Sequence, residues 1–479
     1  VTLETMAMGK GTGPPSATAI TSIRWPVPRA MRVAVLMALP LHPPTACHAF
    51  SSTSSSPTPA SQSPSLAPPI QIFYDSSNYM HRDIKYHPEC PDRVDHCLDA
   101  IRRYFSSDSN ENPGSSAAFL IDVATISLFP SVDSNENTND ITSHDIHPEK
   151  PTHSLEYECE YSSALSKQEL EHATNILTKI HEPSHVASIQ KRCDASRQKR
   201  AEEGKDQLGW IGYIDGSDTY MTTESHNVGV RAAGAWIRAV DAALGSLEVE
   251  KSTKPIGMAL TRPPGHHATY ASSNGFCIYN FAMAAASHAL SIDPSMKISI
   301  LDWDVHFGQG VMDILDKCSN GDGAENDWTS HVRYASLHQV PCFPYEGQSR
   351  KIQGRYDNVM TIPIQPESTW CCGYRELFTT YALPFLCSKD VWEPDLIIVC
   401  AGYDALDSDE LASVNLAAKD FGEMTMLLRD QIGLSSKNPA LVLGLEGGYQ
   451  LRNGVAGGNL SDGLIETIKA LGDPGRAKS

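Results

Sequence analysis

The sequence predicts an α/β protein whose mostly parallel sheet is covered by helices on both faces. From about residue 256 onward, short apolar runs alternate with helical patterns. The apolar runs are nearly continuous, as is typical of parallel strands buried on both faces. Polar or glycine-rich segments follow several of these runs, at the strand ends where α/β proteins place their ligands.

The ordered part of the chain is expected to begin near residue 70, because residues 70–74 alternate as a strand does. Asp92 is a suitable N-cap for a helix that reaches about residue 105. Two polar insertions, near 106–117 and at 131–153, are predicted to be loops. Helical patterns then cover residues 166–181, 184–192 and 225–244.

The alternation that defines the sheet occupies the second half of the chain. The apolar runs predicted to be strands are 257–260, 298–301, 332–337, 358–362, 396–400 and 441–445. Helical patterns fill the intervals and the end, at 280–290, 308–318, 373–387, 417–432 and 460–471. No internal repeat is present, so residues 70–474 are predicted to form one catalytic domain.

Residues 1–69 differ from the rest of the chain and are expected to be a disordered leader that carries a targeting signal. Within 31–49, a basic flank, a short apolar run and small residues make a secretory-signal pattern, and a Ser/Thr-rich tract follows at 50–69. Met31 is a candidate initiator. The pattern resembles the two-part plastid-targeting leaders of algae with complex plastids, so a plastid location is expected. The alternatives are the cytoplasm or nucleus, if the leader carries no address, and the mitochondrion.

Composition limits the classes of partner. The net charge of -19 disfavours a nucleic-acid-binding surface, which needs a basic patch. The twelve cysteines are scattered without a C-x-x-C pair, as is typical of a reducing compartment. Cys371 and Cys372 are adjacent, and no special geometry follows from that alone. No apolar stretch is long enough for a membrane span.

The segment 301–310, LDWDVHFGQG, places Asp302, Asp304 and His306 at alternate positions after a predicted buried strand. Residues two apart in an extended chain point to the same face. Two carboxylates and an imidazole are costly there unless something neutralises them. A divalent metal would do so. Salt bridges and helix caps are the alternative, and this stretch alone leaves both open.

Three further strand ends carry reactive side chains. His266 and His267 follow a Pro-Pro-Gly turn, and a rigidly held histidine pair suits proton transfer near neutrality. Asp404 follows the strand 396–400. Tyr449 comes after two glycines beyond the last strand, and those glycines let the backbone place its hydroxyl in the crevice. A parallel sheet would gather all of these at one edge.

Together these segments resemble the histone deacetylase superfamily. RPPGHHA, GFCIYNFA, LDWDVHFGQG, the segment 336–344, AGYDALDSDEL and LEGGYQL occur in the family's order, and the N-terminal landmarks are His87-Pro88-Glu89 and Asp218-Thr219-Tyr220. The resemblance implies the arginase/deacetylase fold, with a mostly parallel eight-stranded sheet between helical layers. Trp303, Gln309 and Glu446 are more similar to class II members and related bacterial amidohydrolases than to class I.

The resemblance implies two metal sites. Asp304, His306 and Asp404 match the ligands of one catalytic zinc ion (Zn2+), an arrangement that leaves a coordination position open. The side chains or carbonyls that match a structural potassium ion (K+) are those of Asp302, Asp304, His306, Ser336 and Leu337.

The resemblance also implies catalytic roles and a substrate tunnel. His266 and His267 match the pair that activates the water and protonates the leaving amine, with Asp302 as the carboxylate beside the first histidine. Tyr449 matches the tyrosine that stabilises the developing oxyanion. The tunnel for an acyl-lysine chain matches Gly275, Phe276, Phe343 and Leu411.

Four departures from the family patterns carry expectations. Class I members have an aspartate where this chain has Gln309, so we expect His267 to stay neutral more easily than its neighbour and to be the better general base. Phe307 replaces a usual histidine, which should change packing but spare zinc binding. Leu411 replaces the glutamate of polyamine-selective members and favours a neutral acyl-lysine. Gly308 stands where arginases place a further metal ligand, which disfavours a two-metal site.

The leading hypothesis is therefore a zinc-dependent amidohydrolase that removes an acetyl or related acyl group from lysine in a protein or peptide. The alternatives are a deacylase of small amides such as acetylpolyamines, and a catalytically silent acyl-lysine-binding protein. No nucleic-acid partner is expected, and the sequence carries no signal for the oligomeric state.

Overall fold

The computed structural model describes residues 68–83, 86–107, 122–126, 165–214, 218–245, 254–319 and 327–472. The predicted leader lies outside the described residues apart from Pro68 and Pro69, and with it the candidate initiator Met31. The predicted insertion at 131–153 also lies outside them, as does most of the insertion near 106–117.

Within this part of the chain, one nine-stranded sheet has the order β2-β1-β5-β11-β10-β6-β7-β9-β8. Eight strands run parallel to their neighbours, and only β8, at the edge, pairs antiparallel with β9. The predicted mostly parallel sheet is confirmed, and β8 is one strand more than the eight expected. The bounds are β1 Ile70–Asp75, β2 Asp122–Ile126, β5 Ile256–Leu260, β6 Ile298–Asp302, β7 Val332–Gln339, β8 Lys351–Gln353, β9 Val359–Ile364, β10 Leu396–Ala401 and β11 Ala440–Leu445.

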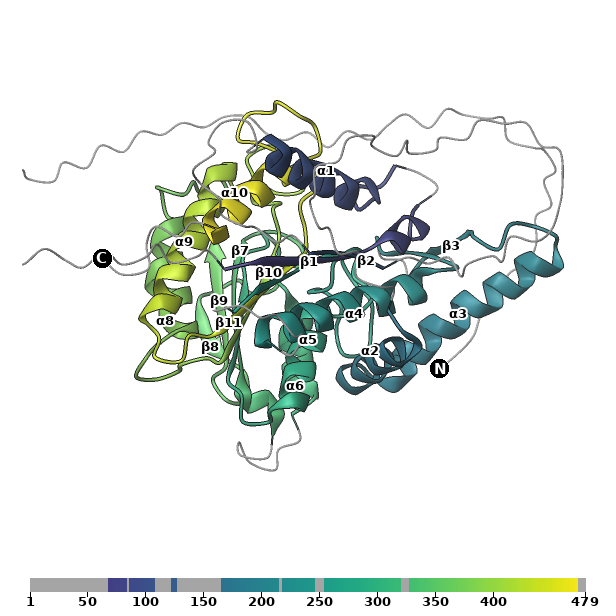
Figure 1. The fold of residues 1–479 in the computed structure, drawn as a ribbon, viewed down its shortest axis with the longest axis horizontal. Helices are drawn as coiled ribbons and strands as arrows, with labels where there is room; N and C mark the ends of the chain where they lie inside the picture. The colour runs from purple at the N-terminus through teal and green to yellow at the C-terminus, as the bar shows by residue number, and fades with distance from the viewer. Residues whose placement is uncertain are drawn as a thin grey trace, which may run out of the picture. The chain divides into compact units, whose positions relative to one another are not determined.

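Helices cover both faces of the sheet because its central strands are apolar on both sides (Figure 1). In β10, Ile398 and Cys400 belong to one core cluster, whereas Ile397 and Val399 belong to the other, as the alternation of a strand requires. The first cluster is covered by α2 (Lys167–Ile180), α3 (Pro183–Glu202), α4 (Ser225–Leu244), α5 (Phe281–Ile292) and α6 (Gln309–Lys317). The second is covered by α1 (Asp92–Ser107), α7 (Tyr374–Leu377), α8 (Leu383–Leu386), α9 (Ala418–Leu434) and α10 (Leu460–Gly472).

Local signals start the helices next to the sheet. Ser166 caps α2 in a capping box, in which the Glu169 carboxylate accepts a hydrogen bond from the Ser166 amide (2.7 Å). Asn280 caps α5 by accepting from the Met283 amide (3.0 Å). None of the described helices is long and apolar enough to cross a membrane.

Several elements differ from the sequence prediction. The helix predicted at 184–192 extends to Glu202 as α3. The helix predicted at 373–387 is continuous over 374–386, but its middle turn, Phe378–Ala382, is π-helical and lies just before Pro384, which cannot donate a backbone hydrogen bond. The short hairpin β3 (Trp210–Tyr213) and β4 (Tyr220–Thr222) was not predicted. Two 3-10 turns, Ser76–Met80 and Trp328–His331, complete the described elements.

Candidate active site

Neighbouring strands end level with one another at one edge of the sheet. β6 ends at Asp302, and the register pairs Asp302 with Cys400 of β10. Ala401, the last residue of β10, pairs with Leu445, the last residue of β11. The Glu446 amide then donates to the Ala401 carbonyl (3.2 Å), which holds the segment after β11 beside the end of β10. The loops after these strands are therefore brought together, as the sequence predicts.

Asp304, His306 and Asp404 form a cluster that could hold a metal ion. One donor atom from each of the three buried residues lies within 4.8 Å of the others. His306 Nδ1 is 3.2 Å from Asp304 Oδ1 and 2.9 Å from Asp404 Oδ2. The second carboxylate oxygens accept from the amides of Gly447 (2.7 Å) and Val305 (2.9 Å), which fixes their orientation. Two carboxylates and one imidazole are a suitable donor set for zinc.

The electrostatics of this cluster call for a cation. Burial opposes a charged imidazole, but hydrogen bonds to Asp304 and Asp404 hold the pKa of His306 well above its ordinary value. Burial and the nearby Asp304 carboxylate raise the pKa of Asp404 to about 7. Without an ion, a protonated imidazole is the positive charge between the two carboxylates, and a divalent ion would supply positive charge at the same point.

The predicted histidine pair lies beside the cluster. The rings of His266 and His267 are 4.0 Å apart between centroids. His266 Nδ1 is 3.1 Å from Asp302 Oδ2, and this oxygen also accepts from the Tyr334 hydroxyl (2.7 Å). His267 Nδ1 is 2.7 Å from Gln309 Oε1. One histidine therefore has a carboxylate partner and the other has a neutral amide.

The different partners separate the two pKa values. Burial opposes the charge of His266, but Asp304 and Asp302 together raise its pKa to about 10. Burial lowers the pKa of His267 well below its ordinary value, and the neighbouring His266 and His306 lower it further. This arrangement favours a protonated His266 and a neutral His267.

Phe343 packs against the histidine pair, and Phe276 packs against Tyr449. The rings of Phe343 and His267 meet edge to face at 5.0 Å, and those of Phe276 and Tyr449 at 5.6 Å. Gly275 has a φ of +50°, and a Cβ there would lie 2.5 Å from His267 Cδ2 and 2.7 Å from Phe343 Cε1. Glycine at position 275 therefore lets the backbone lie close to the rings of His267 and Phe343.

Leu411 is half-buried on a loop tied to the Tyr449 segment. The amides of Leu411 (3.0 Å) and Tyr449 (2.7 Å) donate to the two oxygens of the buried Asp409 carboxylate. Asp409 thus fixes both segments relative to each other. The sequence reasoning did not select this residue, although it lies within the AGYDALDSDEL motif.

The residues predicted to bind potassium lie on the adjacent strands β6 and β7 and in the loop that follows β6. Ser336 pairs with Asp302 between β7 and β6, and Leu337 follows it. Asp302 Oδ1 accepts from the Asp304 amide (3.2 Å), and Ser336 Oγ is 3.0 Å from His338 Nδ1. The proximity agrees with the prediction, and the potassium site itself stays a prediction.

Phe307 belongs to the hydrophobic core. Its side chain is buried, and its ring lies 4.6 Å from the His338 ring and stacks on Tyr334 at 6.5 Å. Phenylalanine at this position therefore supplies packing in the first core cluster.

A buried ion network holds the turn that precedes the histidines. Both Glu89 oxygens accept from the Arg262 guanidinium (2.7 and 2.5 Å), and the Tyr220 hydroxyl also donates to Glu89 (2.9 Å). Arg93 lies 3.8 Å from the same carboxylate. Burial opposes the negative charge of Glu89, but the nearby cations, Arg262 above all, lower the pKa of Glu89 to about 2. Sequence reasoning named Glu89 only as a landmark; the signal it missed is that Arg262 directly precedes the Pro-Pro-Gly turn.

Glu446 anchors the other side of that turn. Its Oε2 accepts from the amides of Gly265 (2.6 Å) and His266 (3.1 Å). The carboxylate is fully buried, and burial raises its pKa to about 7. Glu446 therefore positions the backbone from which the histidine pair projects.

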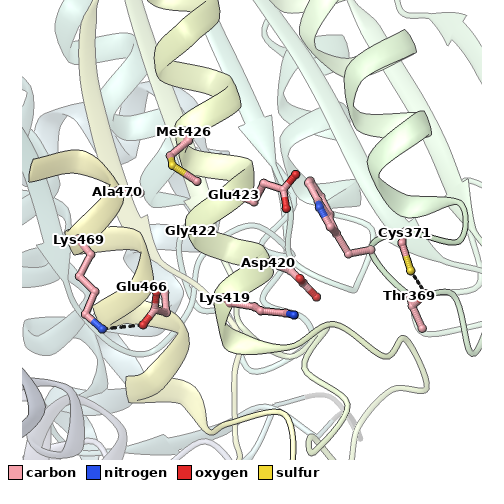
Figure 2. A pocket seen from close by; sticks show the side chains of 11 residues that line it. Thr369, Cys371, Lys419, Asp420, Gly422, Glu423, Met426, Glu466, Lys469 and Ala470 are labelled. Carbon is pink, nitrogen blue, oxygen red and sulfur yellow. Dashed lines mark hydrogen bonds and ion pairs between the residues drawn. The ribbon is translucent and has the colours of Figure 1, made fainter. Parts of the chain in front are cut away.

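A groove of about 530 Å³ lies elsewhere, between α9, α10 and the turn at Thr369–Cys371 (Figure 2). Its lining carries both charges, including Lys419, Asp420, Glu423, Glu466 and Lys469. None of the predicted site residues lines it. The candidate active site is therefore identified by the donor atoms at the strand ends and not by the volume of this groove.

Comparison with known proteins gives a family match. The model of the family described as "Histone deacetylase domain" matches residues 146–458. An uncharacterized protein of Synechocystis is 39% identical over 260 residues, which are 54% of this chain and 74% of that protein. A chloroplastic histone deacetylase of Oryza sativa is 27% identical over 305 residues, 62% of this chain and 61% of that protein. A polyamine deacetylase of Rattus norvegicus is 28% identical over 276 residues, 57% of this chain and 42% of that protein.

The chain thus spans less than two thirds of the length of the plant and animal relatives. Among solved structures, the HD domain of HDA15 superposes with a TM-score of 0.55 at 23% identity. The alignment covers 86% of this chain and 91% of that chain, which shows the shared fold.

Proposed function

This chain belongs to the histone deacetylase family, with class II-like motifs. From that premise, we propose that it hydrolyses acyl-lysine amides in proteins or peptides with one bound zinc ion. The observation that carries the proposal is the meeting of the Asp304, His306 and Asp404 donor atoms beside the His266–His267 pair. We propose residues 70–474 as the catalytic domain.

The proposed zinc ligands are Asp304, His306 and Asp404. Zinc held by three protein ligands supplies a Lewis acid that polarises the amide carbonyl and lowers the pKa of water. The backbone amides of Gly447 and Val305 orient the two carboxylates for this task. A potassium ion on Asp302 and its neighbours is proposed from the family resemblance.

The two histidines divide the proton transfers. His267, which is easier to keep neutral, accepts the proton of the attacking water as general base. His266, which the charges of Asp304 and Asp302 keep protonated, donates a proton to the leaving lysine amine. Hydrogen bonds to the oxygens of Asp302 and Gln309 orient the two rings for these steps.

Tyr449 and the aromatic walls handle the substrate. The Tyr449 hydroxyl donates a hydrogen bond to the carbonyl oxygen as negative charge develops on it. Burial raises the pKa of Tyr449 well above its ordinary value, so the hydroxyl keeps its proton. Gly275, Phe276 and Phe343 form an apolar slot that suits the methylenes of a lysine side chain.

A second candidate is hydrolysis of small acylated amines, since polyamine deacetylases are among the relatives. The uncharged Leu411 disfavours a cationic polyamine, because it offers no carboxylate to pair with an ammonium group. Glu410 is exposed beside it and is the nearest carboxylate in the sequence. We therefore rank acyl-lysine first.

We also propose a plastid location. The predicted leader pattern and the chloroplastic relative of Oryza sativa support it. Histones would not share that compartment, so the substrates would be other acylated proteins.

The test is turnover of a fluorogenic acetyl-lysine peptide by the full chain, with and without added zinc, beside Tyr449→Phe and acetylspermidine. Peptide turnover that requires zinc and is lost in Tyr449→Phe is the expected result. Turnover of acetylspermidine alone would assign the site to small amines. Zinc binding without turnover of acetyl or longer acyl peptides would favour a silent acyl-lysine-binding protein.

A further inference from the structure

Two adjacent thiols lie exposed on the turn that leads into α7. Cys371 and Cys372 are both exposed, and their sulfur atoms are 3.8 Å apart. Cys371 lines the groove of Figure 2, where its sulfur points to the Thr369 hydroxyl at 3.6 Å. The pair is therefore open to a reagent from solution, and each sulfur is within reach of the other.

The pair differs from the other described cysteines, which are all buried or half-buried. Burial raises the pKa of most of them, namely Cys90, Cys97, Cys193, Cys277, Cys318, Cys387 and Cys400. By contrast, hydrogen bonds from Thr369 and then Cys372 lower the pKa of Cys371. Because the thiolate is the nucleophile, thiol chemistry among the described cysteines should be directed to Cys371.

We propose that Cys371 and Cys372 are a reversible oxidation site that closes to a disulfide by exchange with an external disulfide. The Cys371 thiolate attacks that disulfide, which forms a mixed disulfide and releases one thiolate. The Cys372 thiolate then attacks the Cys371 sulfur and releases the second thiolate. The two cysteines lose two electrons and two protons, and the external disulfide is reduced to two thiols.

The geometry makes such a bond easy to reduce. Adjacent Cα atoms are about 3.8 Å apart across a trans peptide, whereas ordinary disulfides join Cα atoms about 4.4–6.8 Å apart. The closed ring is therefore strained, and strained, exposed disulfides are the labile ones. This property suits a reversible modification better than a structural cross-link.

Closure would act on the start of α7. The Thr369 carbonyl accepts from the amides of Cys372 (3.1 Å) and Tyr374 (3.3 Å), and Gly373 between them has a φ of +110°. Tyr374 is buried with its ring 6.0 Å from the Trp370 ring. Tyr374 belongs to the same buried core cluster as Trp303, Val305 and Tyr403, which flank the proposed ligands Asp304 and Asp404. A change in the turn should therefore lower turnover, a consequence that rests on the proposed function.

The test treats the full chain with glutathione disulfide, blocks free thiols with an alkylating reagent and maps the peptides by mass spectrometry. The peptide with Cys371 and Cys372 should escape alkylation and be lighter by two hydrogen atoms, and dithiothreitol should restore alkylation. In Cys372→Ser the ring cannot close, so a stable glutathione adduct on Cys371 is expected instead. Cys318→Ser, which removes a half-buried thiol on another element, should leave ring formation unchanged.

Full alkylation of both residues after oxidation would overturn the proposal, as would two glutathione adducts or a disulfide between two chains. These readouts do not depend on turnover, so their failure is distinct from failure of the proposed function. Ring formation with unchanged peptide turnover would overturn the link to the proposed active site.

Discussion

Replacing Gln309 by glutamate tests the division of labour between the two histidines. Gln309 Oε1 lies 2.7 Å from His267 Nδ1, and among the described residues its Nε2 has no hydrogen-bond partner. Gln309→Glu therefore removes no hydrogen bond and puts a carboxylate in almost the same volume. The variant changes the charge beside His267 and little else.

The expected shift follows from that short distance. A carboxylate and an imidazolium whose charges are about 4 Å apart attract by about 4 kcal/mol at an effective dielectric constant of about 20. This equals about three pH units at about 1.36 kcal/mol each. Burying the new carboxylate in the site opposes its charge, so we expect the pKa of His267 to rise by at least about one unit. A base must be neutral to accept a proton, so the acidic limb of the profile should move to higher pH.

The assay is kcat/KM against pH for the zinc-loaded protein on an acetyl-lysine peptide. Gln365→Glu, which adds the same charge at an exposed position, is the matched control and should leave both limbs in place. If Gln309→Glu folds, binds zinc and keeps the wild-type acidic limb, then His267 is not the general base.

Further predictions concern the oxyanion, the metal and the buried network. Tyr449→Phe should lose about 10²–10³-fold in kcat while zinc content, measured by mass spectrometry, stays at the wild-type level; equal loss of zinc would point to misfolding instead. Asp404→Asn should lower the zinc content of the purified protein, because one of the three proposed ligands loses its charge; an unchanged zinc content would remove Asp404 from the ligand set. Glu89→Gln should destabilise the fold by about 3 kcal/mol, measured by urea unfolding at pH 7. The pKa of Glu89 falls from 4.5 to about 2 in the fold, and each pKa unit corresponds to about 1.36 kcal/mol. The Glu89 pKa is lowered in the fold, so its contribution is present above pH 4.5 and is lost as the pH falls toward about 2; a loss below about 1 kcal/mol at pH 7 would contradict the role of the network.

The sequence alone determined the fold class and the chemistry-bearing segments. Short, nearly continuous apolar runs suit the strands of a sheet covered on both faces, and six such runs in the second half are strands of the observed sheet. Polar residues placed at strand ends, such as Asp302 and Asp404, share one edge because parallel strands all end on the same side. Elements with weaker local patterns, such as the three-residue edge strand β8, depend on their neighbours and were not predicted.

The tertiary structure alone decided which side chains meet. Glu89 reaches Arg262 across 173 positions, and Glu446 reaches the Gly265 amide across 181. Local periodicity carries no information about partners so distant in the chain. The different partners of the two histidines were expected from the family resemblance and not from local periodicity, and the structure supplies their distances. Residue types thus set what chemistry the chain can perform, and long-range packing sets which residue is held where.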